Sequence, residues 1–265
     1  MFWIRFRSAI ILMIIAITTI MLGGNVLFYT VLAISLIGMM ELYRTVKLNK
    51  SLLGIVGYVA CIALDFMILY HYEEYNMVLF IAFLVVLLLI YVFTFPKYRS
   101  EQVAIVFLGL FYVAVMLSYL YKVRVVEDGA YLVWLIFIGS WGSDTSAYCI
   151  GMLFGKHKFL PKLSPKKSLE GCIGGVVGAA LLGFLYGTII KNQITGIDNP
   201  QIAFVIICGA SSVISQVGDL AASAIKRNHD IKDYGKLIPG HGGILDRFDS
   251  VIFVAPIVYS LALIL

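Results

Sequence analysis

Three charged residues stand where the last apolar segment of the chain begins, in a position where charge is unexpected. Asp246, Arg247 and Asp249 follow the stretch PGHGG and precede an apolar run that continues to Leu265. Asp246 and Asp249 are three positions apart, so a helix would point both carboxylates the same way. Acidic groups in a first helical turn also interact favourably with the helix dipole, so one interpretation is a charged cap.

The surrounding residues favour a second interpretation, a site for a metal ion and a phosphate. Gly242 and Gly243 offer bare backbone amides that can close around phosphate oxygens, and His241 lies beside them. Four basic residues come before this turn: Lys226, Arg227, Lys232 and Lys236. Carboxylates alone repel a phosphate, whereas carboxylates among cations suit a divalent ion that bridges protein and phosphate. Mg²⁺ is usually held by one or two carboxylates together with substrate phosphates.

A third carboxylate, Asp219, lies near the end of the preceding apolar segment. Ser215, Asp219, Ser223 and Lys226 follow one another at helical spacing and therefore share one helix face. An ionised aspartate at bilayer depth costs roughly 2.5–3.5 kcal/mol, so a cation must meet it. That cation is either a metal or cationic substrate, or a lysine or arginine of a neighbouring helix. The first alternative predicts one metal site built by Asp219, Asp246 and Asp249.

A second polar region contains Asp144, in the stretch WGSDTSAY, and the lysine-rich loop that follows it. The turn from Ser164 to Lys167 leads into the next helix, and a helix N-terminus with adjacent lysines is an anion site. Alternatively, the lysines only set the membrane topology or touch anionic lipid. That alternative accounts for Lys156, Lys158 and Lys162 better than for Lys167.

The composition excludes an ordinary soluble domain. Hydrophobic residues make up 61% of the chain and charged residues 13%, whereas soluble domains have roughly 45–50% apolar and about 25% charged residues. About 20 apolar residues span a bilayer as a helix, which satisfies its own backbone polar groups. We therefore predict an all-α, polytopic integral membrane protein with about nine transmembrane helices. The segments are 8–22, 25–43, 51–71, 77–95, 102–121, 130–152, 171–190, 201–225 and 250–265.

The loops predict the orientation of the chain. The connections ELYRTVKLNK, PKYRS and GKHKFLPKLSPKKSLEG are basic, and HYEEYN is acidic. The positive-inside rule then places the N-terminus, the basic loops and the segment 226–249 in the cytoplasm. We expect an integral protein of the cell (inner) membrane whose active site faces the cytoplasm. The predicted spans within residues 1–122 are almost purely apolar, with Asp65 the main exception. We therefore predict that residues 1–122 are a scaffold of transmembrane helices and that residues 123–265 are the catalytic region with its cytoplasmic loops.

Glycines recur at four-residue spacing in the segment 171–190. Pairs of this kind are Gly171/Gly175, Gly174/Gly178 and Gly183/Gly187. Small residues at this spacing let helices approach closely, either within one chain or across a dimer. Packing within the chain is the favoured interpretation, and a homodimer is a possible partner arrangement.

The stretch SAIKRNHDIKDYGKLIPGHGGILDRFD, residues 223–249, resembles the signature of the phosphatidate cytidylyltransferase (CDP-diacylglycerol synthase) family. Every fixed position of that signature is present. The upstream stretches around Trp141, Asp144 and Lys167 are also similar to the family, so the resemblance covers roughly residues 141–250. The earlier segments share only a similar hydropathy.

The resemblance implies that CTP and phosphatidic acid react, with Mg²⁺, to give CDP-diacylglycerol and pyrophosphate in phospholipid biosynthesis; it implies no nucleic-acid partner. Asp219, Asp246 and Asp249 are expected to hold the metal. The expected catalytic residues are Asp219, Ser223, Lys226, Arg227 and Asp246, although Ser223 has no evident activating base. The expected substrate-binding residues are Asp144, Ser164, Lys167, Lys232, His241, Gly242, Gly243 and Arg247.

Two other functions are compatible with parts of this sequence. A CTP-dependent lipid kinase of the polyprenol type would share the membrane helices and metal site but would release CDP rather than pyrophosphate. A transporter or channel could use Asp144 and Asp219 as a cation path. It would have no need of PGHGG or SPKKS, and the sequence lacks repeat symmetry.

Overall fold

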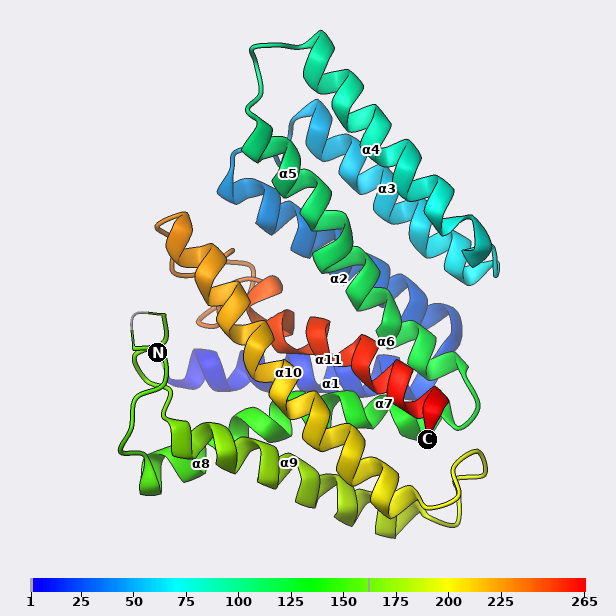
Figure 1. The fold of residues 1–265 in the computed structure, drawn as a ribbon, viewed down its shortest axis with the longest axis vertical. Coiled ribbons are helices and arrows are strands. Elements are labelled where there is room, and N and C mark those ends of the chain that lie inside the picture. Colours follow the sequence, from blue (N-terminus) through cyan, green and yellow to red (C-terminus); the bar gives the residue numbers. More distant parts are fainter. Residues whose placement is uncertain (1, 162) are drawn as a thin grey trace. The chain divides into compact units, whose positions relative to one another are not determined.

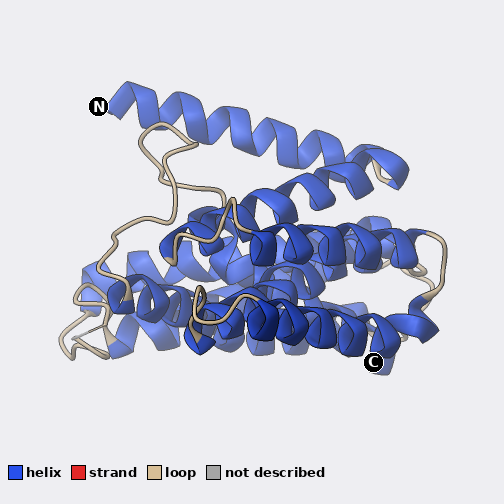
Figure 2. Cartoon of the chain, turned by 90° about the horizontal axis from the view of Figure 1, so that it is seen from above, coloured by secondary structure: helices blue, strands red, loops and turns tan. Residues whose placement is uncertain are grey.

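The computed structural model describes residues 2–161 and 163–265, with side chains at all of these except Phe2, Ile4 and Arg5. Helices account for 78% of the chain, and the described residues form no sheet. Figure 2 shows these helices joined by loops. The prediction of an all-α protein is therefore confirmed. Lys162, one of the lysines assigned to topology, lies outside the described residues.

The helices follow the predicted segments closely (Figure 1). In chain order they are α1 (Phe2–Leu22), α2 (Gly24–Thr45), α3 (Leu52–Leu69), η1 (Glu73–Tyr75), α4 (Asn76–Phe93), α5 (Ser100–Gly109), η2 (Leu110–Val115), α6 (Met116–Val125), α7 (Gly129–Phe137), η3 (Ile138–Gly142), α8 (Ser143–Phe154), α9 (Leu169–Ile190), α10 (Pro200–Asn228) and α11 (Leu245–Ile264).

Within the described residues, seven helical segments are long and apolar enough to cross a membrane, as expected of a polytopic membrane protein. They correspond to α2, α3, η1 with α4, α5 through α6, α9, α10 and α11. The other two predicted segments are also helical. Phe6–Leu22 is a shorter apolar helix. The run 129–154 is broken in its apolar character by Asp144 and the glycines and serines around it.

Two of the long helical runs contain a π-helical segment. One is η2, between α5 and α6, and the other is η3, between α7 and α8. A π segment widens the helix by one residue per turn and is frequent at functional sites. The segment η3 ends one residue before Ser143, so Asp144 lies in the first turn after it.

The chain forms two compact units. The first comprises residues 1–118 and 229–247, and the second comprises residues 119–228 and 248–265. The loop that carries PGHGG thus belongs to the same unit as the N-terminal helices. The predicted roles of residues 1–122 as a scaffold and of residues 123–265 as the catalytic region stay predictions.

In the first unit, α2, α3, α4 and α5 pack side by side (Figure 1). Tyr43 of α2 is fully buried, and its hydroxyl donates to the carbonyl of Val106 at 2.9 Å. Its ring lies directly against Gly57 of α3 and Gly109 of α5. Because neither glycine has a side chain, both helices can approach the aromatic ring closely.

In the second unit, α9 packs closely against both α8 and α10 (Figure 1). The buried face of α9 carries Gly171, Gly175, Gly183 and Gly187. A methyl group at Gly175 would lie 3.1 Å from the side chain of Ala147, and one at Gly183 would press on Cys208 of α10. The interpretation that these glycines pack helices within one chain is therefore confirmed. The homodimer stays a prediction.

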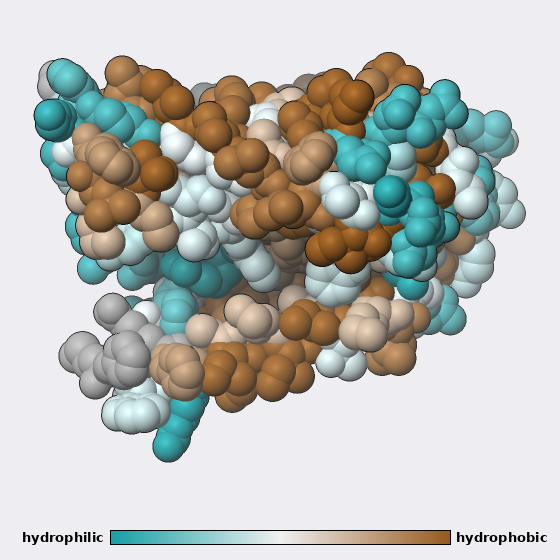
Figure 3. Space-filling model, turned by 90° about the horizontal axis from the view of Figure 1, so that it is seen from below, coloured by the Kyte–Doolittle hydropathy of each residue, from teal (hydrophilic) through white to brown (hydrophobic). Residues whose placement is uncertain are grey.

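Large apolar side chains cover much of the outer surface. Figure 3 shows broad hydrophobic areas on one face, with hydrophilic residues gathered in separate clusters. Val78, Phe93 and Ile189 are 62%, 83% and 75% exposed. Exposed apolar area on this scale marks an interaction surface in a soluble protein, but it is the expected surface of helices that face lipid.

Candidate active site

The signature loop between α10 and α11 folds into a tight turn around its glycines. The amide of Ile238 donates to the carbonyl of Gly242 at 2.9 Å, and the amide of His241 donates back to Ile238 at 3.0 Å. Gly240 and Gly242 have φ angles of 78° and 86°, a left-handed conformation that glycine adopts without steric cost. The sequence PGHGG therefore forms this turn for backbone reasons, whatever it binds.

Asp246, in the first turn of α11, joins the two arms of the signature loop by hydrogen bonds within the first unit. Its side chain is buried, and Oδ2 accepts hydrogen bonds from the amides of Tyr234 at 2.8 Å and Gly243 at 3.0 Å. The two donors lie on the two arms of the loop. Charge-assisted bonds of this kind are stronger than neutral ones, so the carboxylate fixes the loop and the loop fixes the carboxylate.

A fourth carboxylate, Glu41 of α2, was missed by the sequence interpretation, which treated ELYRTVKLNK as a basic connection. Glu41 is 2% exposed. Its Oε1 accepts from the amide of Ile244 at 3.2 Å, and its Oε2 accepts from the amide of Leu245 at 2.9 Å. The signal that could have found it is the one used for Asp219: a carboxylate inside an apolar helix needs a partner.

These contacts change how the predicted anion nest is understood. The amide of Gly243 already donates a hydrogen bond to Asp246, and the amides of Ile244 and Leu245 donate to Glu41. A phosphate could take the amide of Gly243 only if that donor left Asp246. The roles of Gly242 and Gly243 in substrate binding stay predictions. His241 fits such a role, because its Nδ1 is buried without a hydrogen-bond partner among the described residues.

Asp219 lies in the second unit, and its partner there is Lys167. Lys167 Nζ lies 2.6 Å from Asp219 Oδ2, and both side chains are partly exposed, at 23% and 31%. The second alternative for this aspartate, an ion pair with a lysine of a neighbouring segment, is therefore present in the structure. The pair does not decide the metal prediction, because a carboxylate has two oxygens with about four lone-pair sites.

The turn that carries Lys167 has the predicted form. Its amide donates to the carbonyl of Ser164 at 3.3 Å. The next residue, Ser168, caps α9 by accepting from the amide of Gly171 at 3.2 Å. Lys167 is thus anchored immediately before a helix start, and its side chain reaches α10.

Asp249 and Asp144 lie on helices that pack against the same bundle in the second unit. The carbonyl of Asp249 and the ring of Phe253 lie directly against Gly218, the neighbour of Asp219. Asp249 itself is buried, and its Oδ1 accepts from the amide of Ser250 at 2.9 Å. Asp144 is exposed, and the preceding Ser143 is joined to Ser212 of α10 by a 2.6 Å hydrogen bond.

The remaining predicted residues differ in exposure. Ser223 and Lys226, near the end of α10, are half-buried, and Ser164 and His241 are half-buried as well. Arg227, Lys232 and Arg247 are exposed. The predicted site residues are divided between the two units. The second unit contains Asp144, Ser164, Lys167, Asp219, Ser223, Lys226, Arg227 and Asp249. The first unit contains Lys232, His241, Gly242, Gly243, Asp246 and Arg247.

The comparisons with known proteins cover nearly the whole chain. The model of a family described as "Cytidylyltransferase family" matches residues 3–265. The chain belongs to the cytidylyltransferase family. It is similar to the phosphatidate cytidylyltransferase of Bacillus subtilis, with 31% identity over 263 residues that cover 97% of this chain and 96% of the relative. The phosphatidate cytidylyltransferase of Staphylococcus haemolyticus is 30% identical over 96% of each chain.

A third relative has a higher identity over a shorter stretch. The phosphatidate cytidylyltransferase of Haemophilus influenzae is 44% identical over 128 residues, which are 48% of this chain and 44% of the relative. The resemblance derived from the signature is thus confirmed, and the protein is a membrane-embedded transferase of the cytidylyltransferase class.

The metal site of this cytidylyltransferase stays a prediction. Among the described residues, no group of three or more His, Cys, Asp or Glu side chains is arranged to hold a metal ion. Asp246 belongs to the first unit, and Asp219 and Asp249 belong to the second. The chemistry of the three residues nevertheless fits, because carboxylate oxygens are the ligands that Mg²⁺ prefers.

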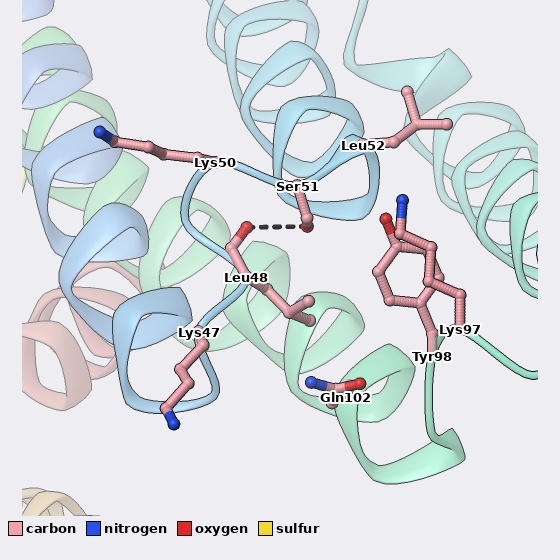
Figure 4. Close-up of a pocket in the computed structure, with 8 residues that line it drawn as sticks. All are labelled: Lys47, Leu48, Lys50, Ser51, Leu52, Lys97, Tyr98 and Gln102. Atoms are coloured by element: carbon pink, nitrogen blue, oxygen red, sulfur yellow. Dashed lines mark hydrogen bonds between the residues drawn. The ribbon is translucent and has the colours of Figure 1, made fainter.

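A basic depression in the first unit is separate from these residues (Figure 4). Its volume is about 460 Å³. It is lined by Lys47, Leu48, Lys50, Ser51, Leu52, Lys97, Tyr98 and Gln102. Gln102 joins its two loops by donating to the carbonyl of Val46 at 3.1 Å. The three lysines belong to loops that the positive-inside rule assigns to the cytoplasm, and none was predicted as a site residue.

Proposed function

We propose that this protein transfers the cytidylyl group of CTP to phosphatidic acid and so forms CDP-diacylglycerol and pyrophosphate. The observation that carries the proposal is the similarity, over 97% of the chain, to a protein named phosphatidate cytidylyltransferase. The intact signature between Ser223 and Asp249 supports it further. CTP and phosphatidic acid are therefore the proposed substrates, and we propose no nucleic-acid partner.

The reaction is proposed to take place at the cytoplasmic face of the cell (inner) membrane. Phosphatidic acid resides in the bilayer, and CTP is soluble and charged. Residues 229–244, the central part of the signature, form a loop at the end of α10. By the positive-inside rule this end is cytoplasmic, since the basic loops belong on that side. The two substrates can meet only at such a boundary.

The proposed chemistry is a single in-line displacement. A phosphate oxygen of phosphatidic acid attacks the α-phosphorus of CTP, and the bond from that phosphorus to the β-phosphate oxygen breaks. Pyrophosphate leaves with the electron pair. The nucleophile is already ionised at neutral pH, so no strong general base is needed. Catalysis then depends on positioning and on stabilising the negative charge.

Basic side chains are proposed to hold the phosphates. Arg227 and Arg247 can each bind phosphate through two parallel hydrogen bonds, a geometry that lysine cannot provide. Lys226 and Lys232 contribute positive charge. Lys167 Nζ lies 2.6 Å from Asp219 Oδ2, so a phosphate bound there would meet a cation beside a proposed metal ligand. Asp144, Ser164 and His241 complete the proposed substrate contacts.

Mg²⁺ is the proposed cofactor, and Asp219, Asp246 and Asp249 are the residues that would hold it. When bound, it would neutralise charge on the phosphates and orient them. Asp246 is suited to this task because two backbone amides fix its orientation. Ser223 shares a helix face with Asp219 and is proposed to orient substrate rather than to act as a nucleophile.

The decisive experiment follows the two ends of CTP. The purified protein in detergent would receive phosphatidic acid, Mg²⁺ and CTP labelled both on cytidine and on the γ-phosphate. Labelled pyrophosphate together with a cytidine-labelled lipid is the expected result. CDP together with a phosphorylated lipid would instead identify a CTP-dependent lipid kinase. Intact CTP with every lipid and metal offered would refute nucleotidyl transfer.

A further inference from the structure

Glu41 is the most deeply buried charged residue that the proposed chemistry leaves without a role. It lies in the last two turns of α2, 203 residues before Ile244 in sequence. Its exposed fraction is 2%. A buried ionised carboxylate is costly unless it is fully hydrogen-bonded. The amides of Ile244 and Leu245, at 3.2 and 2.9 Å, are the donors that it meets.

The two donor amides lie at the start of α11. Leu245 is the first residue of α11, and Asp246 follows it directly. The first amides of a helix have no partner within the helix. Glu41 therefore caps α11 from another helix and holds the backbone on the N-terminal side of Asp246. The side chain of Leu245 also lies near Gly38, one turn before Glu41 on α2.

The glycines of the signature fit the same arrangement. A methyl group added at Gly235 would overlap Oε1 of Glu41, and one added at Gly243 would overlap both carboxylate oxygens. Neither position has a left-handed backbone, because neither is among the residues with positive φ. Within the described structure, the contact that demands glycine at these two positions is therefore the carboxylate of Glu41.

A second contact ties the same loop to the N-terminal helices. Ser8 of α1 donates a hydrogen bond to the carbonyl of Pro239 at 3.1 Å. This bond is exposed, whereas those of Glu41 are buried. Glu41 is therefore the stronger of the two anchors between the loop and the helices of the first unit.

We propose that Glu41 is a positioning residue of the active site: it fixes the start of α11 and so orients Asp246. The proposal rests on the proposed function, since Asp246 is there assigned to catalysis. Glu41 itself touches no substrate atom in this scheme. The first unit then does more than anchor the protein in the membrane, because one of its helices sets the geometry of a reacting group.

The test compares Glu41→Gln with Asp65→Asn in the full-length protein. Glutamine keeps the size of Glu41 but has one acceptor oxygen, so one of the two amides loses its partner. Asp65 is a matched control, because it is also a buried carboxylate within a helix of the first unit, 3% exposed, and its described contact is with Cys61 of its own helix. Glu41→Asp is a second variant, since its shorter side chain cannot reach both amides.

Two readouts separate positioning from folding. Steady-state kinetics with CTP and phosphatidic acid should show kcat lowered about 10- to 100-fold in Glu41→Gln, because a small misplacement of a reacting group has effects of this size. The KM for CTP should change less than kcat. Hydrogen exchange of the protein without substrate should accelerate at Ile244 and Leu245, and not in helices of the second unit. Asp65→Asn should change neither readout.

Each outcome decides the proposal. Loss of kcat with faster exchange at Ile244 and Leu245, in either Glu41 variant, supports it. Unchanged kcat in a folded Glu41 variant overturns it, and so does an equal loss in Asp65→Asn, which would indicate a general folding effect. If the wild-type protein forms no cytidine-labelled lipid, the proposed function fails, whereas the exchange measurement still reports whether Glu41 holds the start of α11.

Discussion

Asp246 and Asp219 are both carboxylates of the candidate site, but the molecule holds them in different ways. Asp246 is buried and accepts hydrogen bonds from two backbone amides. Asp219 is 31% exposed, and its partner is the side chain of Lys167. A backbone donor cannot leave without unfolding the loop, whereas a lysine on a flexible four-carbon stem can move. The comparison indicates that the carboxylate of Asp246 keeps its backbone partners, whereas Asp219 can exchange its lysine partner for another cation.

Asp246→Asn should give the largest effect and tests the carboxylate that keeps its backbone partners. The amide side chain removes the negative charge and directs an NH₂ group toward backbone donors or forces a flip. We expect kcat to fall about 1,000-fold, as for the loss of one essential electrostatic group. Pyrophosphate release measures this. An Asp246→Asn protein that kept most of its activity would falsify the assignment of Asp246 to the metal.

Lys167→Gln should give a smaller effect and tests the exchangeable partner of Asp219. Removing the cation beside Asp219 should lower kcat/KM for CTP about 10- to 100-fold, since a charge-assisted contact to phosphate is lost. Stability should change by no more than about 1 kcal/mol, because partly exposed ion pairs contribute little. Thermal unfolding checks this. A large drop in Tm would mean that the pair is structural and that the two carboxylates are held alike.

Gly218→Ala tests whether the packing beside Asp219 is as tight as the loop around Asp246. The new methyl group would meet Phe253 at 2.6 Å and the carbonyl of Asp249 at 2.9 Å. Overpacking of this kind typically costs about 1–3 kcal/mol. Gly209→Ala is the matched control on the same helix, since its methyl group would lie 3.9 Å from Ala180 in ordinary contact. Equal Tm values for the two variants would contradict the packing described here.

Ser168→Ala should give the smallest effect and sharpens the account of Lys167. Ser168 caps α9 directly after that lysine. Loss of a serine cap costs about 1 kcal/mol of stability. If the cap also fixes the lysine, kcat/KM for CTP should fall by a few-fold, measured at a temperature where the variant is fully folded. An unchanged kcat/KM would show that Lys167 finds Asp219 without help from the turn.

The helices of this protein could be predicted well from sequence, because hydrophobic residues in runs of about 20 have few alternatives. All nine predicted segments are helical, and their ends differ from the structure by a few residues. The turn from Ser164 into α9 was also predictable, since serine capping is a local effect. The sequence also indicated that Asp219, in an apolar segment, needs a cationic partner, and Lys167 lies 2.6 Å from it.

What could not be predicted depends on contacts between distant segments. Nothing local to α2 indicates that Glu41 meets the amides of Ile244 and Leu245, since these residues are over 200 positions apart. From sequence alone, the glycines of PGHGG therefore indicate only a phosphate-binding role. Likewise, the cation that meets Asp219 is either a metal ion or a lysine. The spacing of residues along one helix does not show which side chain of another segment reaches this aspartate.

The π-helical segment η3 has a consequence for how this site can change over evolution. A π turn is equivalent to one residue inserted into an α-helix, and one residue of an α-helix corresponds to a rotation of about 100°. Deleting a single residue within Ile138–Gly142 would remove that extra residue and restore regular α winding, so Asp144 would keep nearly its present direction, whereas a deletion in a regular α-helix rotates every later residue by about 100°. The segment η3 is thus a point where the chain length can change by one residue while Asp144 keeps its orientation, so an alignment gap there would matter less than one in the regular helices beside it.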